Sequence, residues 1–316
     1  MKIGFYICWN KGSLEGSGNV LGDELFAESM CRFLGRIKTV KNCKVYAPND
    51  LPSGKLDLMV YLNDTPPNPG WAGKHLLYIQ NARPEGADKF LREFHKLGYD
   101  GYAFVSSRLL EIHKKTGRDG IYLPFGVDTE FFYPRQQDRS YVFEVAYVGN
   151  DIKGEQRTLR YLYPAVDFNF GLYGTWNSFR RFQFWKNRPY QAKFFRISKG
   201  KIPQNDVPVL YSSAKINLNC TAQDCVDWDV ITLRTLEVLA CGGFLITDKV
   251  PMAEKELSDC VVFTEGGADL TEKIKYYLAN AVERKRVSGN GYEYVLKRAS
   301  LKVRMDALYR YVDSIL

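Results

Sequence analysis

The strongest constraint on the fold is a regular alternation of short apolar runs with stretches of helical periodicity. In the first half of the chain, apolar runs of strand length occur at residues 2–8, 56–62, 75–79, 101–105 and 120–123. Helical patterns occur between them at residues 22–34, 87–97 and 108–115. Because parallel strands are joined by crossovers that are usually helices, this alternation predicts an α/β unit with a doubly wound parallel sheet.

The alternation stops near residue 135 and then starts again. Strand-like runs follow at residues 142–148, 168–173, 214–219 and 244–248, with helical patterns at 158–162 and 231–240. A chain of 316 residues is too long for one ordinary core and suits two domains of about 150 residues each. We therefore predict two Rossmann-like units, residues 1–135 and 136–300, followed by an amphipathic C-terminal helix at residues 301–316.

The composition favours an ordinary cytoplasmic protein. No apolar run approaches the roughly 20 residues needed to cross a bilayer, and no small-residue cleavage site follows the N-terminal run. The seven cysteines are odd in number and contain no C-x-x-C, which favours free thiols in a reducing compartment. His75, His95 and His113 are far apart in the sequence, so we expect surface or hydrogen-bonded roles rather than zinc ligation.

The balance of charge indicates an anionic partner. The formal net charge is +8 and the isoelectric point is near 9.0. Phosphates, an anionic membrane surface and nucleic acid would all satisfy this charge, and the charge alone does not choose among them.

One segment, residues 176–201, concentrates this charge. It contains eight basic residues, eight aromatic residues and no acidic residue. Such a mixture suits an anionic membrane surface or a nucleic-acid backbone with base stacking. The alternative is that the aromatic rings belong to the core while the cations face water.

The turns after the strands are the places to look for chemistry, because ligands of open α/β sheets bind at the carboxyl ends of strands. The first turn is rich in glycine, including Gly16 and Gly18, and precedes a helix whose N-terminus attracts anions. Its spacing matches neither G-x-G-x-x-G nor a P-loop. It is therefore either a ligand-binding loop or a flexible connector.

The second unit opens with a strand that runs into Gly149, followed by Lys153 and Arg157. If both cations lie on a helix, their spacing of four places them on one face. Two such cations beside a helix N-terminus suit a diphosphate, although the same pattern also occurs on solvated helix faces.

The segment 227–244 carries the clearest local signal. Asp229 is suited to cap a helix that starts at Val230, and a Gly-Gly pair ends that helix. Arg234 and Glu237 share one face of this otherwise apolar helix, and buried charges need partners. Either they pair with each other, or Arg234 binds a phosphate while Glu237 accepts hydrogen bonds from a ribose.

The pair Asp227-x-Asp229 also resembles the metal-binding D-x-D of the GT-A glycosyltransferases. In that fold, the motif ends a strand, whereas here it precedes a helix late in the second unit. We therefore expect no metal site.

Several blocks of the C-terminal half resemble the GT-B glycosyltransferases, especially spore-maturation-type bacterial glycosyltransferases, and also phage DNA β-glucosyltransferase. These blocks are YVGN (147–150) with the following Arg157, GKIP (200–203), INLN (216–219) and residues 229–248. The stretch LPFGVD (123–128) is similar to the interdomain segment of many retaining members. The likeness covers about residues 120–316, and the N-terminal half matches only in general layout.

The resemblance implies a GT-B fold, with two Rossmann-like domains facing a cleft and a C-terminal helix that crosses back to the N-terminal domain. It also implies a donor site in the second domain. Lys153, Arg157 and Arg234 would contact the donor diphosphate, the backbone around Ile202 the nucleobase, and Glu237 the ribose. Gly149, Thr232 and Asp229 complete the set of donor-site candidates; Asp229 stands where many relatives place the first glutamate of an E-x7-E motif, but it is shorter.

The resemblance supplies no catalytic base. Inverting relatives use an aspartate at the end of an N-domain strand, and the best-aligned residue here is Asn81, which cannot act as a base. Asp64 ends the neighbouring strand and is one candidate, while Asp23 and Glu24 at the start of the first helix are others. Capping or surface charge would explain all three equally well.

By this resemblance we expect transfer of a sugar from a nucleotide diphosphate sugar, a UDP-sugar, to a hydroxyl of a cell-surface glycan or lipid-linked acceptor. No cofactor or metal is expected, and the location would be cytoplasmic with peripheral contact to the inner membrane face. Glucosylation of a DNA base and a non-catalytic GT-B-like binding protein are the alternatives.

Overall fold

The computed structural model describes residues 1–12, 22–80, 86–176 and 182–315, and it divides the chain into two compact units. The first comprises residues 1–126 together with 301–316, and the second comprises residues 127–300. The sequence predicted that the first domain ends at residue 135. The structure assigns residues 127–135 to the second unit, where Val127 N–H donates to Ala299 O and Arg135 N–H donates to Ser212 Oγ.

The N-terminal unit is built around a parallel sheet of six strands in the order β2-β1-β3-β4-β5-β6. The strands are β1 (Lys2–Tyr6), β2 (Asn42–Tyr46), β3 (Leu56–Tyr61), β4 (Ala72–Ile79), β5 (Gly101–Phe104) and β6 (Ile121–Tyr122). The helices of this unit are α1 (Asp23–Leu34), α2 (Ala87–Lys96), α3 (Ser107–Lys114) and α12 (Leu301–Ile315). The strand order reverses between β1 and β3, which therefore form the topological switch point of this sheet.

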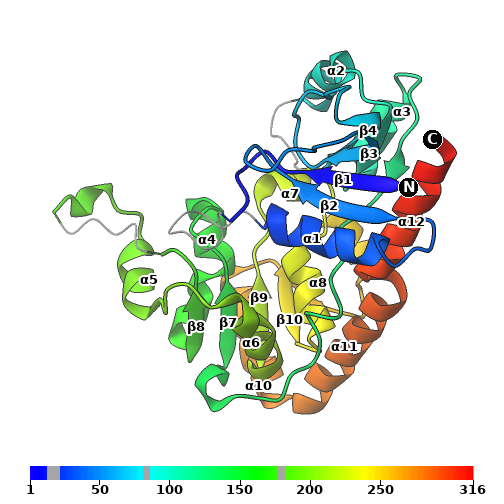
Figure 1. Ribbon diagram of the computed structural model, residues 1–316. Helices are drawn as coiled ribbons and strands as arrows, with labels where there is room; N and C mark the ends of the chain where they lie inside the picture. The colour runs from blue at the N-terminus through cyan, green and yellow to red at the C-terminus, as the bar shows by residue number, and fades with distance from the viewer. Residues whose placement is uncertain (13–21, 81–85, 177–181, 316) are drawn as a thin grey trace. The chain divides into compact units, whose positions relative to one another are not determined.

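The last helix, α12, belongs to the N-terminal unit although it is the end of the chain. Figure 1 shows it in red beside α1, and the two helices are in contact. Tyr311 Oη accepts a hydrogen bond from Tyr102 N–H at 3.3 Å, and Arg304 Nε donates to Phe125 O at 3.2 Å. The apolar face predicted for this segment is buried at Leu301, Met305, Leu308 and Val312.

The C-terminal unit has a parallel sheet of five strands in the order β11-β10-β9-β7-β8. The strands are β7 (Val145–Val148), β8 (Phe170–Tyr173), β9 (Ile216–Asn219), β10 (Leu245–Asp248) and β11 (Val262–Thr264). Its α-helices are α4 (Glu155–Tyr161), α5 (Gln191–Ile197), α6 (Val207–Ser213), α7 (Gln223–Asp227), α8 (Leu233–Ala240), α9 (Pro251–Glu256), α10 (Gly267–Ala279) and α11 (Ala281–Tyr294). Here the order reverses between β7 and β9.

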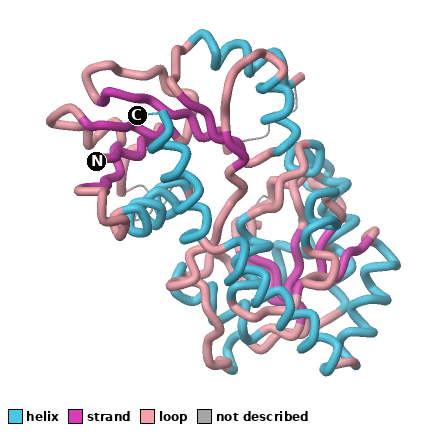
Figure 2. The backbone as a smooth tube through the Cα atoms, turned by 90° about the vertical axis from the view of Figure 1, so that its right-hand side faces the viewer, coloured by secondary structure: helices cyan, strands magenta, loops and turns pink. Residues whose placement is uncertain are grey.

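These two parallel sheets with surrounding helices confirm the predicted fold class (Figure 2). Most expected elements form within a few residues of their predicted bounds. The sequence patterns missed the strands β2 and β11 and the helices α5, α6, α7, α9, α10 and α11. Apart from α10 and α11, these elements are at most seven residues long, which is too short for a distinct apolar pattern.

The cysteines carry free thiols, including Cys31 and Cys43, whose sulfur atoms lie 2.9 Å apart in the N-terminal unit. No helix within the described residues has the length and apolar character needed to cross a bilayer.

Two histidines that are 18 residues apart in the sequence meet in the N-terminal unit. His95 Nε2 and His113 Nδ1 share a hydrogen bond of 2.9 Å, and His113 Nε2 lies 3.0 Å from Asp119 O. Burial and the positive charge of Arg118 lower the pKa of His95 to about 4, and burial also lowers the pKa of His113. The pair is therefore neutral in the folded protein at pH 7.

This pair predicts that the N-terminal unit loses stability as the pH falls from 6.5 towards 4. In this window, the unfolded chain protonates a histidine of ordinary pKa 6.5, whereas folded His95 with a pKa of about 4 stays neutral. Urea midpoints measured at several pH values should fall with pH in the natural protein and fall less steeply in a His95→Gln/His113→Gln variant. An equally steep fall in that variant would contradict the prediction, and Lys96→Gln on the exposed face of α2 serves as the control.

Candidate functional site

The candidate site lies at the carboxyl edge of the C-terminal sheet, where the strand order reverses between β7 and β9. Gly149 follows β7, and Asn219 and Asp248 are the last residues of β9 and β10. Side chains from three neighbouring strand ends meet there, as expected for the ligand site of an open α/β sheet.

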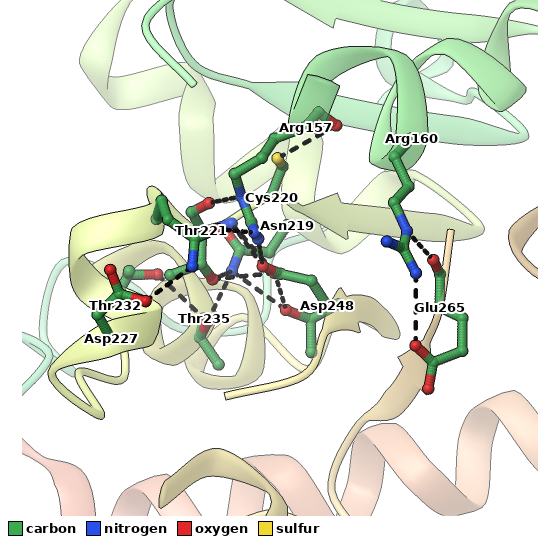
Figure 3. A network of polar contacts seen from close by, with 12 residues as sticks. Arg157, Arg160, Asn219, Cys220, Thr221, Asp227, Thr232, Thr235, Asp248 and Glu265 are labelled. Carbon is green, nitrogen blue, oxygen red and sulfur yellow. Dashed lines mark hydrogen bonds and ion pairs between the residues drawn. The ribbon is translucent and has the colours of Figure 1, made fainter. Parts of the chain in front are cut away.

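A buried polar network joins these strand ends (Figure 3). Asp248 accepts hydrogen bonds from Thr221 N–H at 3.0 Å and Thr221 Oγ1 at 2.9 Å. Asn219 Nδ2 donates to Thr221 Oγ1 and Thr247 Oγ1, both at 3.1 Å, and more distantly to Thr235 Oγ1. Asn219, Thr221 and Asp248 are each at most 2% exposed, so these hydrogen bonds replace water that cannot reach them.

Arg157 is part of this network. Its guanidinium forms a short ion pair with Asp248, donates to Thr221 O at 2.7 Å and donates to Gln223 Oε1 at 2.8 Å. Lys153 and Arg157 would share a helix face only if both were helical, and this condition is not met, because α4 begins at Glu155 and Gly154 has a positive φ of 82°. Arg157 therefore supports the strand ends through Asp248.

Arg234 is placed by the same network from the first turn of α8. Its Nη1 donates to Asn219 Oδ1 at 2.9 Å, and its guanidinium carbon lies 4.8 Å from the centre of the Tyr147 ring. Gly149 makes room for this arrangement, since a Cβ there would lie 2.7 Å from both Arg234 Nη2 and Tyr147 Oη. The Tyr147 hydroxyl is buried and has no hydrogen-bond partner among the described residues.

Glu237 lies one turn beyond Arg234, yet no ion pair within 4.0 Å joins the two among the described residues. The interpretation that they simply pair with each other is therefore wrong. Burial raises the pKa of Glu237 to about 7, and the nearby charge of Arg234 only partly opposes this effect. Arg234 and Glu237 are both half-buried residues.

Lys153 adds a second cation beside Arg234. Burial lowers its pKa, and the positive charge of Arg234 lowers it further. No hydrogen bond or ion pair of the Lys153 amine occurs within the described part of the chain. Two cations that repel each other in this way attract an anion.

Asp229 has the most unusual backbone among the described residues. It is the one non-glycine residue there with positive φ, at 60°, and its Oδ1 is buried without a hydrogen-bond partner. The prediction that it caps a helix starting at Val230 is wrong, because α8 begins at Leu233 and Thr232 is its N-cap residue. Such strained residues cost about 1–3 kcal/mol and tend to gather at functional sites.

The remaining donor-site candidates lie in the same unit. Thr232 Oγ1 lies 3.3 Å from Thr235 Oγ1, at the start of α8. Ile202 packs beside the apolar cluster of Phe143, Ala146, Tyr173, Leu210 and Ala214, and its backbone N–H makes no hydrogen bond to described residues.

The candidates of the N-terminal unit lie at its own switch point or outside the described residues. Gly16, Gly18 and Asn81 fall outside them. Both carboxylate oxygens of Glu24 accept a hydrogen bond from Gly12 N–H, at 3.1 and 3.2 Å, so this side chain holds the first turn. Asp64 is exposed just after β3.

Asp23 lies near the same strand ends as Asp64. A hydrogen bond joins its carboxylate to Asn63, and Asn63 Oδ1 accepts from Cys8 N–H at 3.1 Å. Burial raises the pKa of Asp23, while the hydrogen bond from Asn63 partly offsets this. A carboxylate that is partly buried at a strand end is better suited to take up a proton than one of ordinary pKa.

No group of three metal-ligating side chains occurs among the described residues. Asp227, the first residue of the D-x-D pair, is exposed and accepts a hydrogen bond from Gln223 Nε2 at 2.8 Å.

The sequence patterns did not single out Tyr147, Asn219, Thr221 or Asp248 as members of the site. The available signal was the position of Asn219 and Asp248, because each is a polar residue that ends an otherwise apolar strand. Burying a polar residue at that edge of a parallel sheet raises the free energy of the folded protein unless the residue forms hydrogen bonds with another residue or with a ligand.

Residues 156–310 match the family model described as glycosyl transferase-like, a match that spans just under half of the chain. No curated protein sequence shows significant similarity to the chain.

Solved structures with the GT-B fold resemble the whole chain. Sucrose-phosphate synthase from Thermosynechococcus elongatus is 13% identical with a TM-score of 0.68, and all of both chains is covered. HepE from Anabaena in complex with UDP-glucose is 12% identical with a TM-score of 0.68, and T4 phage β-glucosyltransferase with its UDP-glucose substrate is 17% identical with a TM-score of 0.65. Each of these two comparisons covers 99% of this chain and 100% of the other.

The buried network predicts a strong effect of Asp248→Asn on stability. The change leaves Arg157 without its carboxylate in a buried setting, which we expect to lower the free energy of unfolding by about 3 kcal/mol. The control is Glu265→Gln, which removes the exposed partner of Arg160 (Figure 3) and should leave the urea midpoint almost unchanged. Equal effects of the two changes would show that the Asp248 ion pair has no special role.

Proposed function

We propose that this chain, which has the GT-B fold and carries a glycosyltransferase-like domain, transfers a sugar from a nucleotide diphosphate sugar to a hydroxyl group. The observation that carries the proposal is the pair of cations at the β7–β9 switch point. Lys153 is near enough to Arg234 for the positive charge of Arg234 to lower its pKa, and Glu237 follows Arg234 by one turn of α8.

The donor is proposed to be a UDP-sugar. HepE and the T4 enzyme, which share this fold, have structures with UDP-glucose. In this proposal Lys153 and Arg234 bind the diphosphate, the backbone at Ile202 meets the edge of the base, and Glu237 accepts hydrogen bonds from the ribose hydroxyls. Asp229 would use its unpartnered Oδ1 to accept a hydrogen bond from the transferred sugar.

The chemistry follows from where negative charge develops. When the bond between the sugar and the diphosphate breaks, the departing phosphate gains charge, and cations already fixed beside it stabilise that charge without reorganising. Arg234 is fixed by Asn219 and Tyr147, so its position does not depend on the ligand. Two protein cations can supply this stabilisation, and the proposal therefore includes no metal requirement.

The base that activates the acceptor hydroxyl is proposed to be a carboxylate of the N-terminal unit. The candidates are Asp64, Asp23 and Glu24, of which Glu24 accepts a hydrogen bond from Gly12 N–H. Replacing each carboxylate in turn with the corresponding amide distinguishes them, because the variant that lacks the base should lose turnover while nucleotide binding in the other unit is kept.

The acceptor is proposed to be a growing cell-surface glycan or a lipid-linked precursor at the cytoplasmic face of the membrane. Glucosylation of a DNA base is the second candidate, favoured by the net charge of +8 and by the likeness to the T4 enzyme. Duplex binding that weakens steeply with salt would support this second candidate, because phosphate contacts release counterions.

Ligand-induced stabilisation tests the donor site. UDP and a UDP-sugar should raise the melting temperature, because a ligand that binds only the native state stabilises it by mass action. Lys153→Met should abolish this rise and yet increase the melting temperature of the free protein, since it removes a partly buried amine beside Arg234. Lys255→Met, an exposed change in the same unit, is the control. No stabilisation by UDP, GDP, ADP or CMP, with or without magnesium, would refute the donor site and favour a non-catalytic protein.

Binding of the nucleotide sugar should weaken as the pH falls below about 7. The carboxylate form of Glu237 accepts hydroxyl hydrogen bonds, and with a pKa of about 7 this form is lost by protonation in that range. Calorimetric titration with a UDP-sugar is suitable, because its diphosphate does not titrate there. Glu237→Gln should bind more weakly and without this pH dependence, and an unchanged pH profile in the variant would contradict the role of Glu237.

A further inference from the structure

The C-terminal unit contains a surface segment on which every charged side chain is a cation. Residues 182–201, here called the basic aromatic segment, contain no aspartate or glutamate. Its six cations are all exposed, and they are Lys186, Arg188, Lys193, Arg196, Lys199 and Lys201. None of these residues belongs to the donor site proposed above.

The aromatic side chains that the structure describes in and next to this segment divide into two groups, the first of which is core. Trp176, Tyr190 and Phe194 are at most 3% exposed and pack together, with the Trp176 and Phe194 ring centres 5.0 Å apart. Tyr190 Oη also donates to Asp151 Oδ1 at 2.6 Å. These contacts fix the base of the segment to the sheet.

The second group faces solvent. Phe182 is 90% exposed, Trp185 is 67% exposed and Phe195 is 45% exposed. The free energy of a large aromatic side chain falls when its surface leaves water, so three rings with this much exposed surface, close in sequence to six cations, form a surface suited to binding a partner. In Figure 1 the light-green turn η3 (Phe184–Lys186), next to a grey trace, projects away from α5 and β8.

We propose that the basic aromatic segment binds the surface of an anionic lipid bilayer. Trp and Phe insert at the boundary between headgroups and acyl chains, while Lys and Arg remain at the level of the phosphates. The absence of acidic residues means that no side chain of the segment is repelled by such a surface. The anchored base allows Trp185 to enter the interface without loss of the fold.

Nucleic acid is the competing partner, and the arrangement favours lipid. Single-stranded nucleic acid is bound by aromatic faces that line a positively charged groove. Here the exposed rings of Trp185 and Phe195 belong to the turn η3 and the short helix α5, and Figure 1 shows that turn projecting away from the sheet. A projecting apolar group surrounded by cations is suited to penetrate a soft anionic layer.

Vesicle flotation with the full chain tests this proposal. The protein should float with phosphatidylcholine vesicles that contain phosphatidylglycerol and not with phosphatidylcholine alone, and the bound fraction should fall as salt is raised. Phe182→Ser/Trp185→Ser and Lys193→Gln/Lys199→Gln should each reduce binding several-fold. The matched control is Val282→Ser/Lys285→Gln, which removes one exposed apolar and one exposed basic side chain from α11 and should bind as the natural protein does.

Two results would overturn the proposal. One is equal vesicle binding by the natural protein and the segment variants, or no binding at all. The other is tighter binding to a single-stranded oligonucleotide than to anionic vesicles at the same salt, lost in the same variants, which would assign the segment to nucleic acid. Stabilisation by UDP in these variants reports separately on the donor site, so the two proposals fail independently.

Discussion

The site of the C-terminal unit depends on one buried carboxylate, that of Asp248. A buried charge without a partner is unfavourable by several kcal/mol, so Asp248 requires the guanidinium of Arg157 and the backbone and hydroxyl of Thr221. These partners come from α4 and from the turn after β9. Thr221 also accepts a hydrogen bond from Asn219, the last residue of β9, and Asn219 orients Arg234 by accepting a hydrogen bond from it. Satisfying one carboxylate therefore fixes the position of a side chain that does not touch it.

The cations of this unit consequently divide into two kinds. Arg157 uses its donors on protein atoms and holds the strand ends together. Burial and the positive charge of Arg234 lower the pKa of Lys153. This lowering means that the charged form of Lys153 is less favourable in the folded protein than in the unfolded chain. Proteins retain unfavourable features of this kind where function requires them. A negatively charged ligand changes the sign of that interaction, which is why we infer binding there and structural support at Arg157.

The sequence predicted the framework better than it predicted these roles. Strands covered on both faces by helices leave continuous apolar runs, so β3, β4 and β10 were readily found, whereas the half-polar edge strand β2 was not. The contacts of Arg157 with Asp248 and Thr221 could not be predicted, because they join α4 to residues more than 60 positions further along the chain. The positive φ of Gly154 also could not be predicted, and it starts α4 only at Glu155, after Lys153. The role of Asp248 depends on β9 and β10 being neighbours in space, which the pattern of a single segment does not contain.

The sequence and the structure give different roles to Asp229. An aspartate before an apolar helix predicts a cap, and a cap would have satisfied its carboxylate at no conformational cost. The chain instead places Asp229 at a φ of 60° and leaves Oδ1 buried and unpartnered, two unfavourable features in one residue. Neither contributes to the stability of the free protein. A hydroxyl group of a bound ligand would supply the missing partner, and the residue lies just ahead of the helix that carries Arg234 and Glu237. If the chain binds the sugar as we propose, the strain at Asp229 is preorganisation for that hydroxyl.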